Sequence, residues 1–267
     1  MFDYTQVRNR FNKACHSYDQ YAVVQQEVGR RIDERFEYLK LSPQRILDLG
    51  AGTGQMTQLL QKRHPKAHIV ALDLAEAMLT QVPKTGRFFK QRRVVCADMH
   101  QLPFPAGSFD IVVSNFALQW SHDVRLVMAE VARVLVSGGV FVFSTLGPDT
   151  LLECRLAWSK LDSTMHVHGF LDMHDVGDAL VHNCFADPVM DQEHLTAFYP
   201  NPDQLLQELR SVGVGNTLVE RAAGLTGRHR WQSFKAALEE QRIAEGIPLT
   251  YEVVYGLAWG SGISPVR

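Results

Sequence analysis

A carboxylate and three glycines stand close together in the run DLGAGTG, where Asp48 is followed by Gly50, Gly52 and Gly54. Glycine permits a tight turn and a close approach of the backbone to a ligand. Gln55 occupies the place of the third glycine in the dinucleotide fingerprint, and no Gly-Lys-Ser/Thr of a P-loop follows. A carboxylate repels a diphosphate and attracts an ammonium or a sulfonium group. The loop therefore favours a cofactor with a cationic amino-acid portion.

Two further carboxylates stand at the ends of apolar runs. Asp73 ends the run 69–73, and Asp98 ends the run 94–98. If both runs are parallel strands, their ends meet at the ligand crevice of an open α/β sheet. Asp73 is then suited to accept from the two hydroxyls of a ribose, and Asp98 to accept from an adenine amino group, with Met99 beside the ring. Alternatively, Asp73 caps a following helix, a role compatible with ribose binding, and Met99 fills the core.

The spacing of apolar residues predicts the elements that position these groups. Short apolar strands are expected at 45–49, 69–73, 94–98, 109–114 and 140–144. Helical patterns are expected at 19–39, 56–64, 75–82 and 124–135. Strands that alternate with helices imply right-handed crossovers and a buried parallel sheet.

The second half of the chain is less regular. Further strands are expected at 189–199 and 249–259, further helices at 173–184, 202–212 and 230–244, and two helical pieces within 147–172. The simplest interpretation is one α/β domain, residues 1–267, with a mostly parallel seven-stranded sheet and helices on both faces. The expected parts are an N-terminal helical cover at 1–41, a core sheet at 42–146, 173–200 and 247–260, and cap insertions at 147–172 and 201–246.

Composition limits the classes of function. The 267 residues include 27 Lys+Arg and 29 Asp+Glu, a balance that argues against a nucleic-acid binder. The 4 cysteines form no CxxC pair, and neither an apolar leader nor a membrane-spanning run is seen, so we expect a cytoplasmic protein without a membrane partner. His166, His168 and His174 lack recognisable metal-ligand spacing, and we expect no metal.

Four motifs in order resemble the class I S-adenosylmethionine-dependent methyltransferases. They are DLGAGTG at 48–54, LDLAEAML at 72–79, CADMHQLPFPAGSFDIVVSNFALQW at 96–120 and ARVLVSGGVFVFSTLGPDTL at 132–151. The resemblance implies a Rossmann-like fold and S-adenosylmethionine as methyl donor. The positions assigned to that cofactor are Asp48, Gly50, Gly52, Gly54, Asp73, Leu74, Asp98, Met99 and Asn115. For Asn115 the implied contact is the methionine portion, and the alternative is a turn residue.

The rest of the chain is similar to a narrower family, the malonyl-acyl-carrier-protein O-methyltransferases of biotin biosynthesis. The matching runs are RNRFNKACHSYDQYAVVQQEVGRRI at 8–32, STLGPDTL at 144–151, HVHGFLDMHDVGDAL at 166–180, FADPVMDQEHLTAFYP at 185–200, GLTGR at 224–228 and TYEVVYGLAW at 250–259. Ala51 stands where many relatives carry Cys, and His168-Gly169 stands where Asn-Arg is expected. The second departure puts in doubt any substrate contact that this Arg makes in relatives.

The resemblance implies methylation of the free carboxylate of a malonyl thioester on acyl carrier protein or CoA, giving the ester from which a pimeloyl chain is built. That carboxylate is ionised at neutral pH, so no general base is required and we assign no catalytic residue. Candidate substrate contacts are Tyr18, Gln119, Trp120, Arg155 and His166. Trp120 alternatively only packs a helix, and Arg155 alternatively lies on an exposed helix face.

Two basic groups could dock an acidic carrier protein. One contains Arg87, Lys90, Arg92 and Arg93, and the other contains Arg221, Arg228 and Arg230. Such runs are alternatively ordinary solvated surface. Two other functions remain open from the sequence: a class I methyltransferase for another small carboxylate or a quinone precursor, and a non-catalytic regulator that binds S-adenosylmethionine.

Overall fold

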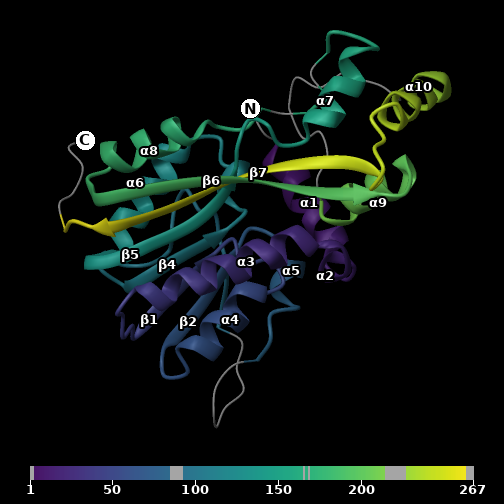
Figure 1. Ribbon diagram of the computed structural model, residues 1–267. Coiled ribbons are helices and arrows are strands. Elements are labelled where there is room, and N and C mark those ends of the chain that lie inside the picture. Colours follow the sequence, from purple (N-terminus) through teal and green to yellow (C-terminus); the bar gives the residue numbers. More distant parts are fainter. Residues whose placement is uncertain (1–2, 85–92, 165, 168, 214–226, 263–267) are drawn as a thin grey trace.

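The computed structural model describes residues 3–84, 93–164, 166–167, 169–213 and 227–262. These residues form a seven-stranded sheet with the order β3-β2-β1-β4-β5-β7-β6 (Figure 1). The strands are β1 (Arg45–Leu49), β2 (His68–Asp73), β3 (Val94–Cys96), β4 (Phe109–Asn115), β5 (Leu135–Leu146), β6 (Phe185–Tyr199) and β7 (Ile247–Gly260). In this described sheet β7 pairs antiparallel with β5 and β6, and the other strand pairs are parallel. The predicted Rossmann-like, mostly parallel sheet is confirmed.

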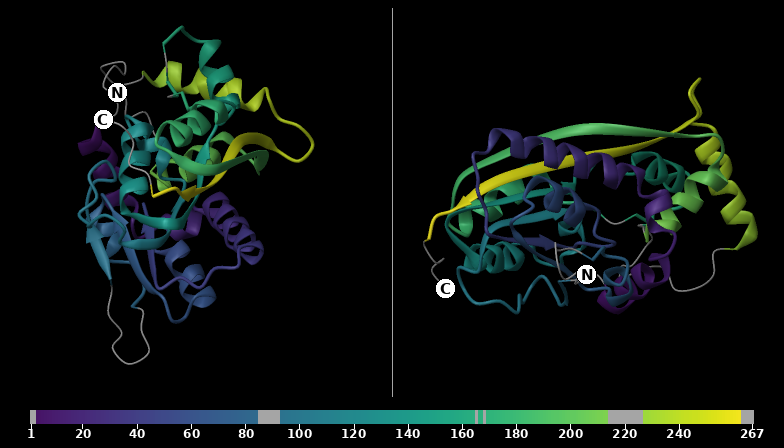
Figure 2. Two further views of the ribbon diagram at one scale, coloured as in Figure 1. Left: turned by 90° about the vertical axis from the view of Figure 1, so that its left-hand side faces the viewer. Right: turned by 90° about the horizontal axis from the view of Figure 1, so that it is seen from below.

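Helices cover both faces of the sheet, as predicted (Figure 2). They are α1 (Tyr4–Ala14), α2 (Tyr18–Tyr21), α3 (Val23–Arg35), α4 (Gln55–Arg63), α5 (Glu76–Leu79), α6 (Val124–Val134), α7 (Leu152–Ser159), α8 (Met173–His182), α9 (Pro202–Ser211) and α10 (Arg228–Glu239), with short 3-10 turns η1 (Phe36–Tyr38) and η2 (Leu118–Trp120). Successive strand residues point to opposite faces. Ile46 therefore packs in one core with α3 and α4, and Leu47 packs in the other with α6 and α8.

The N-terminal region differs most from expectation. The single helix predicted over 19–39 is wrong, because the backbone of Ala22 leaves the helical region (φ −80°, ψ 45°) and separates α2 from α3. Helix α1 lies within the helical cover expected at 1–41, but no helical pattern was assigned to its own residues. Its first turn is capped by Asp3, whose side chain accepts from the backbone N–H of Gln6 at 3.1 Å. The break lets the first two helices turn away from the line of α3.

The second half also departs from expectation in detail. In the described part of 147–172 there is one helix, α7, rather than two. This helix packs against α10, where the rings of Trp158 and Phe234 stack at 4.2 Å between centroids. In Figure 1, α7, α9 and α10 lie together beyond the ends of β6 and β7. None of the helices in the described residues is both long and apolar enough to cross a membrane.

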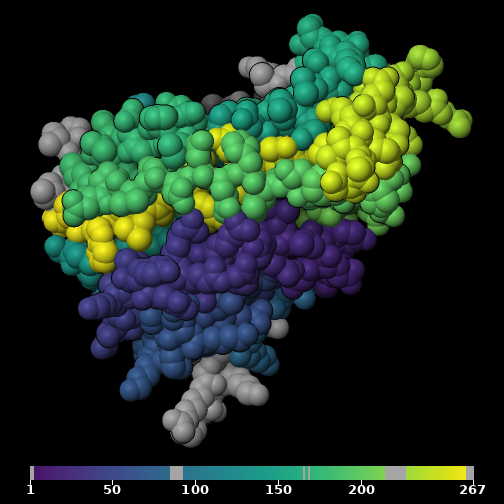
Figure 3. All heavy atoms as spheres, in the orientation of Figure 1, coloured from purple at the N-terminus to yellow at the C-terminus, as the bar shows by residue number. Residues whose placement is uncertain are grey.

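The N-terminal segment, which comprises α1 and α2, is hydrogen-bonded to the edge of the sheet where the parallel strands end. In Figure 3 its residues, in purple, form a band between β6–β7 and the region of α4. Asp19 accepts from the Thr53 hydroxyl at 2.6 Å and from the Gln55 amide at 2.8 Å, so it ties this segment to the glycine loop. Asn12 accepts from the backbone N–H of Ala77 at 3.0 Å. The segment is therefore held over the loop and α5.

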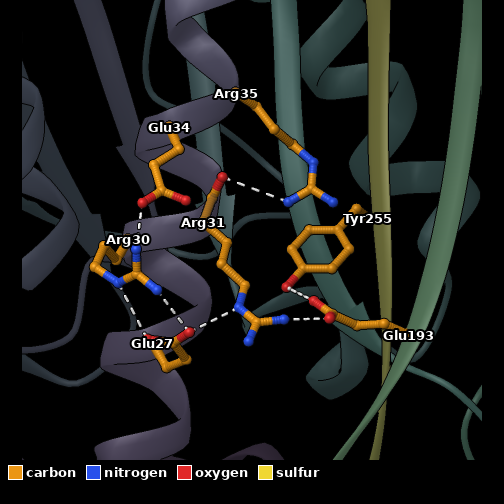
Figure 4. A network of polar contacts seen from close by, with 7 residues as sticks. All are labelled: Glu27, Arg30, Arg31, Glu34, Arg35, Glu193 and Tyr255. Atoms are coloured by element: carbon orange, nitrogen blue, oxygen red, sulfur yellow. Dashed lines mark hydrogen bonds and ion pairs between the residues drawn. The ribbon is translucent and has the colours of Figure 1, made fainter.

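A polar network anchors α3 to the far edge of the sheet (Figure 4). The carboxylate of Glu193 on β6 accepts from the Arg31 guanidinium and from the Tyr255 hydroxyl. The Arg35 guanidinium lies 3.8 Å from the centroid of the Tyr255 ring and pairs with Asp191 at 3.0 Å. Partial burial of Glu193 opposes ionisation, but the hydrogen bonds from Tyr255 and Arg31 outweigh it and hold its pKa below the ordinary glutamate range.

We predict that Glu193→Gln lowers the free energy of unfolding at pH 7 by about 1 kcal/mol, since the charge-assisted bond from Arg31 is lost. Because the folded-state pKa of Glu193 is lowered, its contribution is present above the ordinary glutamate pKa and disappears as pH falls through the folded value. The free energies of unfolding of the unchanged protein and the variant are measured by urea titration, at pH values about one unit apart between pH 3 and pH 7.

Glu34→Gln is the matched control, because Glu34 pairs with Arg30 on the same helix and its side chain is 54% exposed. That variant should change the unfolding free energy by less than about 0.5 kcal/mol. Equal losses in the two variants at neutral pH would contradict an anchoring role for Glu193.

Candidate functional site

A cavity of about 710 Å³ lies where β1, β2 and β4 end. Of the residues predicted to bind the cofactor, those that line it are Gly50, Gly52, Asp73, Leu74, Asp98, Met99 and Asn115. The structure thus brings seven of the nine predicted positions to one cavity.

The glycine loop is tightly built around Asp73. Gly50 has a φ of +76°, and a Cβ there would lie 2.2 Å from the Cβ of Ala117. The backbone N–H of Gly52 donates to one oxygen of Asp73 at 2.9 Å, and the N–H of Ala75 donates to the other at 2.8 Å. A carboxylate has about four acceptor positions, so Asp73 retains two for a ligand. The same side chain therefore holds the loop and faces the cavity.

Asp48 lies beneath the loop and does not contact the cavity. It is only 1% exposed and accepts a hydrogen bond from the Thr57 hydroxyl. Burial raises the pKa of Asp48 to about 7, and the nearby carboxylate of Asp73 adds to this. Gly54 is also outside the cavity lining, with a φ of +86° and close contact to Val82. Any influence of Asp48 on a bound cation is electrostatic and acts through the loop.

Asp98 is oriented by His100. One carboxylate oxygen of Asp98 accepts from the backbone N–H of His100 at 2.9 Å and lies 2.6 Å from its ring Nδ1. The other ring nitrogen lies 2.8 Å from the hydroxyl of Ser121. Partial burial opposes ionisation, yet the hydrogen bonds from His100 lower the pKa of Asp98. An ionised acceptor is thereby fixed on the cavity wall.

Asn115 is occupied by protein partners. Its amide donates to the backbone carbonyl of Gln25 at 2.9 Å, and its side-chain oxygen accepts from the Ser144 hydroxyl at 2.7 Å. The side chain lines the cavity but also clamps the start of α3 onto the end of β4. Contact with the methionine portion of a cofactor stays a prediction for Asn115.

A second, inner cavity of about 520 Å³ adjoins the first. The two share four lining residues, which are Phe11, Tyr18, Phe116 and Trp120. Phe11 meets Trp120 edge to face, with 5.4 Å between ring centroids. Burial raises the pKa of Tyr18, with the nearby carboxylate of Asp73 adding to the shift, so its phenol stays neutral. This aromatic wall is where groups held in the two cavities can meet.

The predicted substrate residues are placed differently from one another. Tyr18, Gln119 and Trp120 line the inner cavity. Arg155 is not in its lining and instead donates to the carbonyls of Pro148 and Thr150. His166 stacks on Trp158 at 3.8 Å between centroids and is also outside the lining. A substrate role for Arg155 or His166 therefore has no support from cavity geometry.

Several residues of the site were missed from the sequence. Tyr4 and Phe11 line the cofactor cavity from α1, and Asp19 holds the glycine loop. The Tyr4 hydroxyl also donates to the carbonyl of Trp120 at 3.0 Å. The available signal was the Asp3 cap before an apolar pair at Val7 and Phe11, which has helical spacing.

One group of side chains in the described residues has metal-ligand geometry. Single ligand atoms of Asp149, His194 and Glu252 lie within 4.8 Å of one another. Glu252 has a structural use, because its carboxylate accepts from the backbone N–H of Asp149 at 2.7 Å and fixes the turn after β5. The histidines that were expected not to bind a metal are not part of this group. His174 pairs with Asp172, and His168 lies outside the described residues.

Comparisons with known proteins fit this geometry. A family model described as "Methyltransferase domain" matches residues 47–143, which include the glycine loop and the ends of β1, β2, β3 and β4. The malonyl-[acyl-carrier protein] O-methyltransferase of Halorhodospira halophila is 43% identical over 98% of this chain and 89% of its own length. The protein of that name from Legionella pneumophila is 44% identical over 95% of this chain and 90% of its own.

The chain belongs to the malonyl-[acyl-carrier protein] O-methyltransferase family. Solved structures agree on the fold of this O-methyltransferase. The YcgJ protein from Bacillus subtilis matches with a TM-score of 0.58 at 18% identity, covering 85% of this chain and 97% of its own. A Haemonchus contortus phosphoethanolamine N-methyltransferase, solved with S-adenosyl-L-methionine, matches with a TM-score of 0.55 at 15% identity, covering 93% of this chain and 57% of its own.

We predict that this O-methyltransferase releases protons when it binds S-adenosylmethionine at pH 7. Asp48 has a pKa of about 7 in the free protein, and the sulfonium and ammonium charges favour its ionised form. Up to about half a proton should be released for each ligand bound. Titration calorimetry in buffers of different ionisation enthalpy measures it.

Asp48→Asn should remove most of that release, and S-adenosylhomocysteine, which lacks the sulfonium charge, should cause less of it in the unchanged protein. Equal proton release by the protein and its Asp48→Asn variant would show that Asp48 does not sense the ligand's charge.

Proposed function

We propose that this chain transfers a methyl group from S-adenosylmethionine to the free carboxylate of a malonyl thioester carried by an acyl carrier protein, as a step in biotin synthesis. The names of its full-length relatives support the substrate. The observation that carries the proposal is the pair of adjoining cavities with one shared aromatic wall. A donor held in one cavity and an acceptor held in the other would meet at that wall.

The outer cavity fits the donor. When bound, S-adenosylmethionine supplies a methyl group activated by a positively charged sulfur. Its ribose hydroxyls and adenine amino group are donors, and Asp73 and Asp98 offer ionisable acceptors on the wall. Leu74 and Met99 give an apolar surface for the adenine ring. The close turn at Gly50 lets the backbone approach the amino-acid portion.

The aromatic wall shared by the two cavities would bring the reacting groups together and align them. A malonyl carboxylate is ionised at neutral pH, so no residue has to remove a proton. Trp120 and Phe116 are each 8% exposed, so the wall offers a largely buried apolar surface at the meeting point. Tyr18 keeps its hydroxyl proton and can donate to the carboxylate while it aligns that group. Proximity and orientation therefore supply the rate acceleration.

The direct test offers labelled S-adenosylmethionine together with malonyl-acyl carrier protein, malonyl-CoA, free malonate and other small carboxylic acids. We expect label in the malonyl thioesters, in a methyl ester that mild base hydrolyses. Tight binding of the donor without transfer to any malonyl thioester would contradict the proposal. Transfer only to a free acid would identify a methyltransferase of another small carboxylate.

We further propose that the carrier protein docks at the start of α10. Arg228 is exposed there, and α10 packs on α9, whose Leu209 lines the inner cavity. Arg93, from the other basic group, lies 2.6 Å from His68 at the beginning of β2, whereas the cavities lie where β2 ends. Arg87, Lys90, Arg92 and Arg221 lie outside the described residues. The position of Arg228 is thus the better one for presenting an acyl arm to the cavity.

We predict that Arg228→Glu raises the KM for malonyl-acyl carrier protein about threefold to tenfold at low salt, with a smaller effect at high salt. The KM for malonyl-CoA and the affinity for S-adenosylmethionine should stay close to normal. Arg93→Glu is the matched charge reversal and should leave the carrier-protein KM nearly unchanged. If Arg93→Glu has the larger effect, docking is at the other basic group. Action in the cytoplasm stays part of this proposal.

A further inference from the structure

Gln119 holds a buried acceptor atom that no group in the described part of the chain uses. Its Nε2 donates to the carbonyl of Phe116 at 2.7 Å, which fixes the orientation of the amide. Its Oε1 is buried and has no donor among the described residues. Such an atom is costly to leave unsatisfied, by about 1–3 kcal/mol, unless a ligand supplies the donor. In the described residues the other such atom is His64 Nε2, which lines neither cavity.

The position of Gln119 is specific. It lines the inner cavity but not the outer one, so it is separate from the donor site. It also lines a larger groove that continues outward between the start of α6 and α8. Phe170 is the other residue common to the inner cavity and this groove. Gln119 therefore lies between the inner cavity and the groove, one residue before the shared wall at Trp120.

The chemistry of the proposed substrate determines what can bind there. An ionised carboxylate and a thioester carbonyl are acceptors only, and both would be repelled by Oε1. The nearest donor in a carried malonyl group is the amide N–H of the cysteamine part of the pantetheine arm, a few bonds beyond the thioester sulfur. With the carboxylate at the aromatic wall and the thioester in the inner cavity, that amide would come next along the arm, on the side where Gln119 separates the cavity from the groove.

We propose that Gln119 Oε1 accepts the amide N–H of the acyl-bearing arm and thereby selects pantetheine-type thioesters, with the rest of the arm lying in the groove. This inference rests on the proposed function and adds a specificity-determining contact to it. Gln119 acts by positioning the arm, and the malonyl carboxylate is placed at the wall as a consequence. A thioester without this N–H would leave Oε1 buried and unpaired.

The test compares two small substrates that differ in one atom group. One is malonyl-N-acetylcysteamine, and the other is its oxygen-ester analogue, S-(2-acetoxyethyl) malonyl thioester, in which an ester oxygen replaces the N–H. For the unchanged protein we expect kcat/KM to be about tenfold or more higher for the amide, since a hydrogen-bonding site rejects an analogue that lacks the donor. Gln119→Met should reduce this ratio to near one.

Gln25→Met is the matched control, because Gln25 lines the same cavity on the α3 side. It should retain the preference for the amide substrate. Equal kcat/KM for the two substrates in the unchanged protein would overturn the inference, as would a preference that persists in Gln119→Met. The first comparison needs no variant, so a folding defect in Gln119→Met leaves the inference testable. If no malonyl thioester of any kind is methylated, the proposed function itself has failed.

Discussion

The Arg31–Glu193 ion pair is the contact on which the rest of the site depends. It ties α3 to β6, at the opposite edge of the sheet from β3. Near the start of this helix, the carbonyl of Gln25 accepts a hydrogen bond from the Asn115 amide. Before the helix, Asp19 accepts a hydrogen bond from the Thr53 hydroxyl of the glycine loop. Two of the four residues shared by the cavities, Phe11 and Tyr18, come from this N-terminal segment. This segment thus forms one side of both cavities, and the contacts of α3 with β6 and β7 hold the helix that follows it.

Burial of two carboxylates determines the electrostatics of the site. It raises the pKa of both Asp48 and Asp73. A raised acid pKa means that the folded state loses stability as pH increases from the ordinary aspartate range toward the folded value, which is about 7 for Asp48. A cationic ligand reverses part of this loss because it favours the ionised carboxylate. In the free protein the ionised form of these carboxylates is therefore disfavoured, and a bound cation makes it more favourable.

Much of the fold could be predicted because a parallel sheet leaves strong local signals. The run 45–49 contains three aliphatic residues and leads into glycines, and the structure has a strand with those bounds. The ends of such strands meet at one edge, which is why Asp73 and Asp98 could be assigned to one cavity. The break at Ala22 could not be predicted, since nothing in its residue type forbids a helix and tertiary contacts decide it. The roles of Arg155 and His166 were equally hidden, because local partners determine where a long polar side chain points.

The proposed function assigns the acceptor to the inner cavity, whose described lining offers no cationic clamp for a carboxylate. Among the described residues, no lysine or arginine lines this cavity, and most of its wall is aromatic or aliphatic. Methyl transfer from a sulfonium to a carboxylate starts from two opposite charges and ends with a neutral ester and a neutral thioether. Charge is therefore already reduced in the transition state, and a poorly polar wall disfavours the separated charges more than the transition state. An arginine on the carboxylate would stabilise the ground state and add to the barrier. Neutral contacts then have to place the substrate: the Tyr18 hydroxyl at the carboxylate, and the buried acceptor of Gln119 at the other end of the malonyl thioester.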